Sequence, residues 1–419
     1  MIKNLFLKTV LCISLFLMVY TPADSCTSAI FTSKVNKDGK PVMWKHRDTG
    51  EENNRIEYFK GPKYSFYALV NSPLVTKGGK RSFEAWSGSN DAGFCIMNTA
   101  SYNLKNDNIP DSKMDNEGTL MFKALGRCKN LADFEKLLDT LKRPMGVETN
   151  FGVIDSEGGA AYYEVNNTSW TKIDVNDPKI APQGYLVYTN HSYTGRKDEG
   201  MGYIRYTTAD NIIKKRIARG GDITPRWILD NLSRSFYHSL LDIDLKEEAV
   251  KNNGLEWFID QDFIPRKSST AVVVFHGSEN PLMWTVLGYP PAAVAVPLCV
   301  KAGEEGIPSF MKSSIKVPDN AKDGFDKKDK RLNAPICDLS LQAKSAIFPV
   351  KRGNGNKYFN FSLLWNIEKT GWIQRIKPVE DYIFSEAEKI DWNKKGNIHS
   401  EYYSSVWEKV KELYEETVK

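Results

Sequence analysis

The spacing of hydrophobic positions predicts strands in the first hundred residues and a mixture of strands and helices afterwards. Short β-like runs are expected at 26–32, 41–45 and 94–97, with an Asp-Gly turn at Lys37–Lys40 between the first two. Helices are expected over 118–127, 131–141 and 206–218 and from Pro225, and strands over 151–154, 160–165, 185–188, 271–275, 283–287 and 292–298. This order favours an α+β fold in which helices cover the outer faces of two packed sheets, a four-layer αββα sandwich.

The first 25 residues are predicted to be a signal peptide. Lys3 and Lys8 precede an apolar run from Val10 to Tyr20, which is shorter than the roughly 20 residues that span a bilayer. Ala23-Asp24-Ser25 fits a signal-peptidase site, and cleavage there makes Cys26 the new N-terminus. We therefore expect an exported protein, periplasmic or extracellular, with no stable membrane insertion once the signal is removed.

A cysteine directly after a signal sequence is also the pattern of a lipidation site. Lipoprotein signals usually carry Leu three residues before the cysteine, where this chain has Ala23, followed by the acidic Asp24. Lipidation would block both the thiol and the amine of Cys26. A non-catalytic, lipid-anchored envelope protein is therefore an alternative that excludes catalysis by this residue.

Composition and charge narrow the remaining classes. The chain has 419 residues, 41% of them hydrophobic, and a net charge of +5, which indicates a globular protein and is too slight a charge to imply a nucleic-acid partner. We expect a main domain over 26–300. The C-terminal extension, 301–419, should pack on it with an exposed lysine-rich loop at 316–331 and a terminal helix over 401–418. A homo-oligomer stays open.

Cysteine and histidine spacing does not predict a metal site or any cofactor. Cys12 leaves with the signal, so five cysteines remain, and no two of them form a CxxC motif. The pairing of Cys95, Cys128, Cys299 and Cys337 cannot be assigned from their spacing. An odd number of thiols in an exported protein leaves at least one to be explained, and Cys26 is the one at the new N-terminus.

An N-terminal cysteine carries its own base. A free α-amine titrates near pH 7.7–8.0, so that of Cys26 is able to take the thiol proton directly or through one water, without a histidine. The resulting thiolate is a strong nucleophile toward an amide or ester carbonyl.

Several motifs in order resemble the N-terminal-nucleophile (Ntn) hydrolases that cleave linear amides. These motifs are Cys26-Thr27-Ser28, Trp44–Asp48, Gly88–Phe94 with Asn98, Asn150–Asp155, Tyr163-Glu164, Tyr188–Asn190 and Arg205-Tyr206. The superfamily includes choloylglycine (bile salt) hydrolases, penicillin V acylases and acid-ceramidase-like amidases. The chain looks closest to the isopenicillin-N acyltransferase-like branch, peptidase C45. The resemblance covers about 26–298 and implies the αββα sandwich of the Ntn hydrolases, and nothing after Val300 contributes to it.

The resemblance implies a role for each matching residue. Cys26 is the nucleophile and, through its amine, the base, and Asp48 holds the amine and the thiol in place. Asn190 donates its side-chain amide to the oxyanion, Arg205 shapes the electrostatics beside the nucleophile, and Asn98 contributes to the oxyanion pocket. Each of the last four also has a plain structural reading, as a turn, ion-pair or helix-start residue.

One departure from the family pattern concerns the cation near the thiol. The usual Gly-Arg-Asn-x-Asp reads Trp44-Lys45-His46-Arg47-Asp48 here. Register places Lys45 where the family has arginine, while alternation along a strand sends Lys45 and Arg47 to the same face. Lys45 is the first choice by register and Arg47 the second.

The resemblance implies an amidohydrolase that acts on a small-molecule acyl amide, not on a main-chain peptide bond, without a cofactor. Acyl transfer to an amine instead of water is the alternative within enzymes. The residues do not name the acyl group or the amine.

Overall fold

The computed structural model describes residues 25–77, 80–316, 328–394 and 399–415. The predicted signal segment up to Asp24 and most of the lysine-rich stretch, 317–327, lie outside the described residues. The strands are β1 (Ser25–Phe31), β2 (Val42–Asp48), β3 (Asn54–Lys60), β4 (Ser65–Asn71), β5 (Thr76–Lys77), β6 (Lys80–Arg81), β7 (Ser87–Asn90), β8 (Cys95–Ala100), β9 (Thr149–Ile154), β10 (Ala160–Val165), β11 (Trp170–Asp174), β12 (Tyr185–Tyr188), β13 (Tyr237–His238), β14 (Ile243–Asp244), β15 (Trp257–Ile259), β16 (Ser269–His276), β17 (Leu282–Leu287), β18 (Val296–Leu298) and β19 (Tyr358–Asn360). The α-helices are α2 (Glu117–Leu125), α3 (Leu131–Thr140), α4 (Tyr203–Ala218), α5 (Pro225–Ile228), α6 (Leu245–Lys251), α7 (Pro335–Ile347), α8 (Trp372–Ala387) and α9 (Ser400–Glu415).

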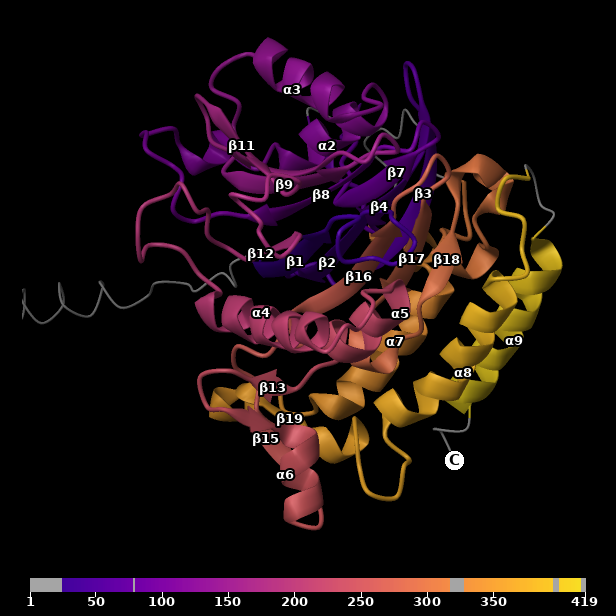
Figure 1. Ribbon diagram of the computed structural model, residues 1–419. Coiled ribbons are helices and arrows are strands. Elements are labelled where there is room, and N and C mark those ends of the chain that lie inside the picture. The colour runs from indigo at the N-terminus through magenta and orange to yellow at the C-terminus, as the bar shows by residue number, and fades with distance from the viewer. Residues whose placement is uncertain (1–24, 78–79, 317–327, 395–398, 416–419) are drawn as a thin grey trace, which may run out of the picture.

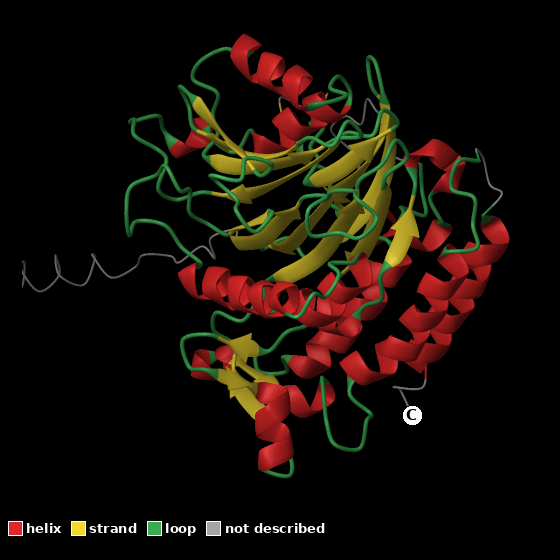
Figure 2. Cartoon of the chain, viewed as in Figure 1, coloured by secondary structure: helices red, strands yellow, loops and turns green. Residues whose placement is uncertain are grey.

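Two antiparallel sheets lie face to face at the centre of the molecule (Figure 1). The first has six strands in the order β12-β1-β2-β16-β17-β18, and the second has seven in the order β11-β10-β9-β8-β7-β4-β3. Helices cover both outer faces, α2 and α3 over the seven-stranded sheet and α4, α5 and α7 over the six-stranded one (Figure 2). The predicted four-layer αββα sandwich is confirmed.

The central strands are buried on both faces. This explains why their sequences do not show a strict alternation of apolar and polar residues. Every residue of β1, β2, β9 and β10 is buried. The two sheets approach closely at Gly152, where a β-carbon would collide with the side chain of Met97 and come within 3.3 Å of Ile30 Cδ1. Glycine at this position therefore allows the two sheets to pack tightly.

Most of the expected elements form, with boundary differences at a few. The strand expected over 292–298 is shorter, Val296–Leu298, because Pro290–Ala292 forms a 3-10 turn that two prolines favour. The strand expected over 94–97 begins one residue later and runs to Ala100. The expected terminal helix is Ser400–Glu415 within the described residues.

The C-terminal extension packs on the six-stranded sheet through α7 and α8. On α8, the ring of Phe384 stacks on Trp284 of β17 with 3.7 Å between ring centroids. On α7, the hydroxyl of Ser340 accepts a hydrogen bond of 2.8 Å from the backbone N–H of Tyr289. No helix within the described ranges is both long and apolar enough to cross a bilayer.

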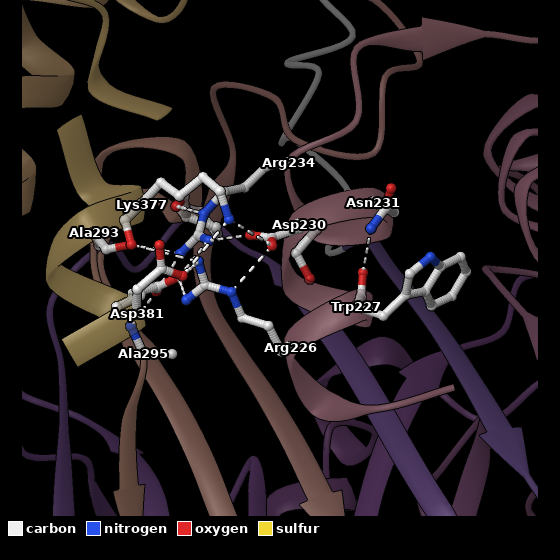
Figure 3. A network of polar contacts seen from close by, with 12 residues as sticks. Arg226, Trp227, Asp230, Asn231, Arg234, Ala293, Ala295, Lys377 and Asp381 are labelled. Atoms are coloured by element: carbon white, nitrogen blue, oxygen red, sulfur yellow. Dashed lines mark hydrogen bonds and ion pairs between the residues drawn. The ribbon is translucent and has the colours of Figure 1, made fainter. Parts of the chain in front are cut away.

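An ion-pair network with a buried centre joins α8 to α5 and to the segment that follows α5. Figure 3 shows Arg226, Asp230 and Arg234 facing the α8 residues Lys377 and Asp381. At the centre of the network, the fully buried Glu380 accepts hydrogen bonds of 2.8 and 2.6 Å from Arg234. Glu380 also accepts a hydrogen bond of 2.7 Å from the backbone N–H of Ala295.

Removing the Glu380 carboxylate should destabilise the whole fold, because Arg234 would be left buried with only the longer ion pair to Asp230, at 3.6 Å. We expect Glu380→Ala to lower the free energy of unfolding by about 3–5 kcal/mol. Urea denaturation followed by circular dichroism measures this. Asp381→Asn is the matched control, since Asp381 is 57% exposed and a surface pair contributes about 0–1 kcal/mol. Equal unfolding midpoints for the two variants would contradict the expectation.

Candidate active site

Cys26 is the second residue of β1 and faces the space between the two sheets. β1 pairs with β2 in a register that places Cys26 opposite Arg47 and Ser28 opposite Lys45. The Ser28 hydroxyl lies 3.1 Å from the hydroxyl of Tyr162 on the opposing sheet, which shows which way this face of β1 points. Because Cys26 and Ser28 are two residues apart, they share that face.

A pocket of about 590 Å³ opens onto Cys26. β1 and β2 form one wall, and the segment from Asn98 to Glu117 with Glu148 forms the other. Four carboxylates, Asp111, Asp115, Glu117 and Glu148, lie on the second wall. Burial raises the pKa of Glu117 to about 7, although hydrogen bonds from backbone N–H groups oppose the rise.

Lys45 and Arg47 both line this pocket, as the strand alternation predicts. Lys45 Nζ donates to the backbone oxygen of Trp86 at 2.7 Å and to Asn98 Oδ1 at 2.8 Å. Arg47 donates to Asn71 Oδ1 at 2.9 Å, and its guanidinium carbon lies 5.2 Å from the Trp86 ring centroid. Arg47 is the cross-strand neighbour of Cys26, whereas Lys45 contacts Asn98, so the choice between the two cations stays open.

Asp48 ends β2 with its side chain buried and both carboxylate oxygens bound. Arg266 donates to Oδ2 from Nε at 2.9 Å and from Nη2 at 2.8 Å. The Ser269 hydroxyl donates to Oδ1 at 2.6 Å. Asp48 also lines the pocket that holds Cys26.

His46 is fully buried beside Asp48. Burial lowers the pKa of His46 to about 4 even though the Asp48 charge opposes the drop, so the imidazole is neutral at physiological pH. Its Nε2 lies 2.8 Å from the Ser269 hydroxyl, while Nδ1 has no hydrogen-bond partner among the described residues. A neutral ring on the outer face of the sheet is in keeping with a thiol that needs no histidine as its base.

Asn190 and Arg205 bind the backbone around Cys26. The Cys26 N–H donates to Asn190 Oδ1 at 3.1 Å, and Arg205 donates to the Cys26 carbonyl and to the Thr27 hydroxyl, both at 2.7 Å. Arg205 also donates to Asn190 Oδ1 at 2.7 Å. The Asn190 amide nitrogen donates to the Ala100 carbonyl at 3.0 Å. This geometry is that of the chain with Ser25 still joined to Cys26, and the oxyanion role of Asn190 stays a prediction.

Ser25 occupies the space next to the nucleophile. Its hydroxyl donates to Asn190 Oδ1 at 2.9 Å and accepts a hydrogen bond from Arg205 at 2.9 Å. Only 9% of Ser25 is exposed. The residue ahead of Cys26 is therefore packed into the site.

The structure thus brings all six predicted site residues into one region. Sequence reasoning missed Arg266, Ser269, Trp86, Glu117 and Glu148. Arg266 and Ser269 stand just before the apolar run of β16, so polar residues at the start of a buried strand were the available signal. The two glutamates carry no pattern that links them to Cys26.

The other four cysteines differ from Cys26 in their surroundings. Cys95, Cys128, Cys299 and Cys337 are buried and free, and burial raises the pKa of each thiol. None of them lines the pocket that holds Cys26. In the part of the chain that the structure describes, no disulfide forms.

A resident metal ion would need several ligands close together. Among the described residues, no three His, Cys, Asp or Glu side chains are grouped so that they could hold one. The four carboxylates on the second wall of the pocket are therefore not grouped closely enough to form a metal site.

Known structures that are similar to this chain include an acid amidase, a conjugated bile acid hydrolase and a penicillin V acylase. A Caenorhabditis elegans N-acylethanolamine-hydrolyzing acid amidase ortholog is 15% identical over 60% of this chain and 92% of its own, with a TM-score of 0.36. A mutant of the conjugated bile acid hydrolase from Clostridium perfringens is 13% identical over 62% of this chain and 89% of its own, with a TM-score of 0.34. Penicillin V acylase from Agrobacterium tumefaciens is 10% identical over 65% and 86%, with a TM-score of 0.33.

These neighbours agree with the group of proteins that the sequence motifs resemble, and the peptidase C45 branch is not named among them. No family model and no curated protein matches the chain.

The thiols should differ sharply in reactivity. In the native mature chain, iodoacetamide is expected to modify Cys26 first, because the other four thiols lie outside the pocket and burial raises the pKa of each of them. Peptide mass spectrometry after brief labelling at about pH 8 measures this, and labelling in urea is the control in which all five react. Faster modification of Cys128 than of Cys26 in the native state would refute the assignment.

Proposed function

We propose that the protein is an exported Ntn amidohydrolase that cleaves linear, non-main-chain amides through a thioester at Cys26. One observation carries the proposal: Cys26 lies at the start of a central strand and opens into a pocket that Lys45, Asp48 and Asn98 also line. A thiol that opens into a cavity lined by cationic side chains is in the environment typical of a reactive cysteine.

The reaction begins with the amine that signal removal creates. The α-amine of Cys26 takes the thiol proton, and the sulfur attacks the acyl carbon of the substrate amide. Negative charge moves to the carbonyl oxygen, where Asn190 and a backbone N–H are proposed to stabilise it. The α-ammonium then gives its proton to the leaving nitrogen as the C–N bond breaks, which leaves the acyl group on sulfur.

Water completes the cycle. The same amine takes a proton from water, the hydroxide attacks the thioester carbonyl, and the acid leaves as the thiol is restored. Asp48 is proposed to hold the amine, Arg205 to fix the backbone of Cys26, and Lys45 or Arg47 to favour the thiolate by its charge.

Two alternatives predict other outcomes. One changes the product of the reaction, and the other is a covalent lipid on Cys26 in place of catalysis. If an amine resolves the thioester, the protein is an acyltransferase, and an added amine acceptor diverts the product from free acid to a new amide. If Cys26 is lipidated, intact mass shows a diacylglycerol adduct. The inward orientation of the Cys26 thiol favours the enzyme, because an acyl glycerol chain would have to lie between the sheets.

Replacing the nucleophile should abolish turnover without unfolding the protein. Cys26→Ser changes one atom, and the hydroxyl is a far weaker nucleophile at neutral pH. We expect activity below the detection limit across a panel of acyl amides read by mass spectrometry, with an unchanged thermal midpoint. Cys95→Ser is the matched control, since Cys95 is also a strand thiol but lies outside the pocket. Wild-type turnover by Cys26→Ser would exclude the proposed nucleophile.

A residue left ahead of Cys26 should also silence the enzyme. The base exists only when the Ser25–Cys26 bond is cut, and Ser25 fills the space beside the thiol. A chain that begins at Ser25 is expected to fold and to stay nearly inactive, whereas one that begins at Cys26 is active. N-terminal sequencing of active, exported protein checks this. Active molecules that begin at any other residue would rule out the amine as base.

A further inference from the structure

We propose that Arg266 is a positioning residue of this site, which holds the Asp48 carboxylate and offsets its charge, and thereby sets the pH range in which Cys26 is deprotonated. The inference rests on the proposed function, because it concerns how the same nucleophile is prepared. Nothing in the sequence around Arg266 resembles the motifs that indicated the other site residues.

The contact between Arg266 and Asp48 is largely buried and made by two N–H groups. Nε and Nη2 both donate to Oδ2, at 2.9 and 2.8 Å, and the two side chains are 16% and 0% exposed. Because two donors from one planar group converge on one oxygen, the contact fixes the direction of the carboxylate as well as its charge.

The turn that carries Arg266 binds the other oxygen too. The Ser269 hydroxyl donates to Asp48 Oδ1 at 2.6 Å and accepts from the Arg266 backbone N–H at 3.0 Å. The Ser269 N–H donates to the Arg266 carbonyl at 2.8 Å. One short turn at the start of β16 therefore places both donors, although Arg266 and Asp48 are 218 residues apart in the chain.

Asp48 is close enough to Cys26 for its charge to matter. The β1–β2 register places Asp48 opposite Ser25, the residue joined to the Cys26 nitrogen, and Asp48 and Cys26 line the same pocket. A carboxylate without a counter-ion at this position would stabilise the α-ammonium and disfavour the thiolate. With Arg266 in place, the two charges offset one another.

The remaining charged groups around Cys26 and Asp48 stay the same in each comparison below. Lys45, Arg47 and Lys105 line the pocket together with four carboxylates, Asp111, Asp115, Glu117 and Glu148. Burial raises the pKa of Glu117 to about 7, so this group titrates in the tested range in every variant alike. Arg205 binds the Cys26 carbonyl from the other face of the sheet. His46 is neutral, as argued above.

Two acidic groups lie beside Arg266 itself. Asp262 interacts with the Arg266 charge at longer range, and Asp260 accepts a hydrogen bond from the Lys267 N–H at 3.0 Å. Burial raises the pKa of Asp260 to about 6. Neither group is altered in the variants below. Differences in the alkylation midpoint between these variants are therefore due to Arg266 and Asp48.

The test is the pH dependence of Cys26 alkylation in the mature chain that begins at Cys26. Iodoacetamide labelling needs no substrate, and peptide mass spectrometry reads Cys26 alone. We expect Arg266→Gln to move the midpoint upward by about one pH unit, because the Asp48 charge is no longer offset. Arg266→Lys keeps the charge and loses one N–H, so its shift should be smaller. The acid limb of kcat/KM should move in the same direction.

Two comparisons separate this role from a general loss of structure. Arg226→Gln removes an arginine of similar exposure, 19%, whose carboxylate partners are Asp230, Glu380 and Asp381 and not Asp48, and should leave the midpoint unchanged. Asp48→Asn should lower the midpoint by about one unit, since Arg266 is then not offset. The double variant Asp48→Asn/Arg266→Gln, with both charges gone, should return close to the wild type.

An unchanged midpoint in folded Arg266→Gln, or an equal shift in Arg226→Gln, would overturn the proposal. If Arg266→Gln does not fold, Asp48→Asn and the double variant provide the test, because neither leaves a buried carboxylate unpaired. Equal alkylation midpoints for these two variants would then overturn the proposal. Shifted midpoints in a protein that hydrolyses no amide would refute the proposed function and not the positioning role. Amide hydrolysis with unshifted midpoints would refute the positioning role of Arg266 and leave the proposed function standing.

Discussion

β1 and β2 pair over seven residues at the centre of the six-stranded sheet, and the candidate site depends on the register of that pairing. A slip by one residue would turn the Cys26 thiol toward the helical layer and bring Thr27 into the pocket. The same slip would separate Asp48 from the turn at Arg266–Ser269. Burial of all positions on both strands makes such a slip costly, since polar and apolar side chains would exchange surroundings.

Around this pair, segments far apart in the sequence meet at one end of the strands β12, β1, β2 and β16. β12 leads into Asn190, α4 begins just before Arg205, and the turn before β16 supplies Arg266. Each of these elements packs through apolar residues away from the site. The backbone therefore already holds the polar side chains close to Cys26. The charged pair Arg234–Glu380 serves the fold in another place, where it joins the C-terminal extension to the helical layer.

Much of the fold and the first set of site residues could be predicted because their signals are local. β9, β10 and β12 are short apolar runs, and Asp48, Asn190 and Arg205 stand in motifs that resemble known enzymes. Arg266 could not be found in this way, because its partner lies 218 residues earlier and only the sheet order brings them together. The strand expected over 292–298 was too long because an apolar run alone does not show where two prolines end the pairing.

The isolation of Cys26 from the other thiols has a chemical consequence under oxidising conditions. Since no second cysteine of the described residues lines its pocket, a sulfenic acid formed on Cys26 has no resolving thiol from these residues beside it. Mild oxidation would then be reversed only by a small external thiol that enters the pocket, and stronger oxidation would continue to the irreversible sulfinic acid. The fold itself would survive either outcome, because within the described residues it is held by packing and hydrogen bonds and not by a disulfide.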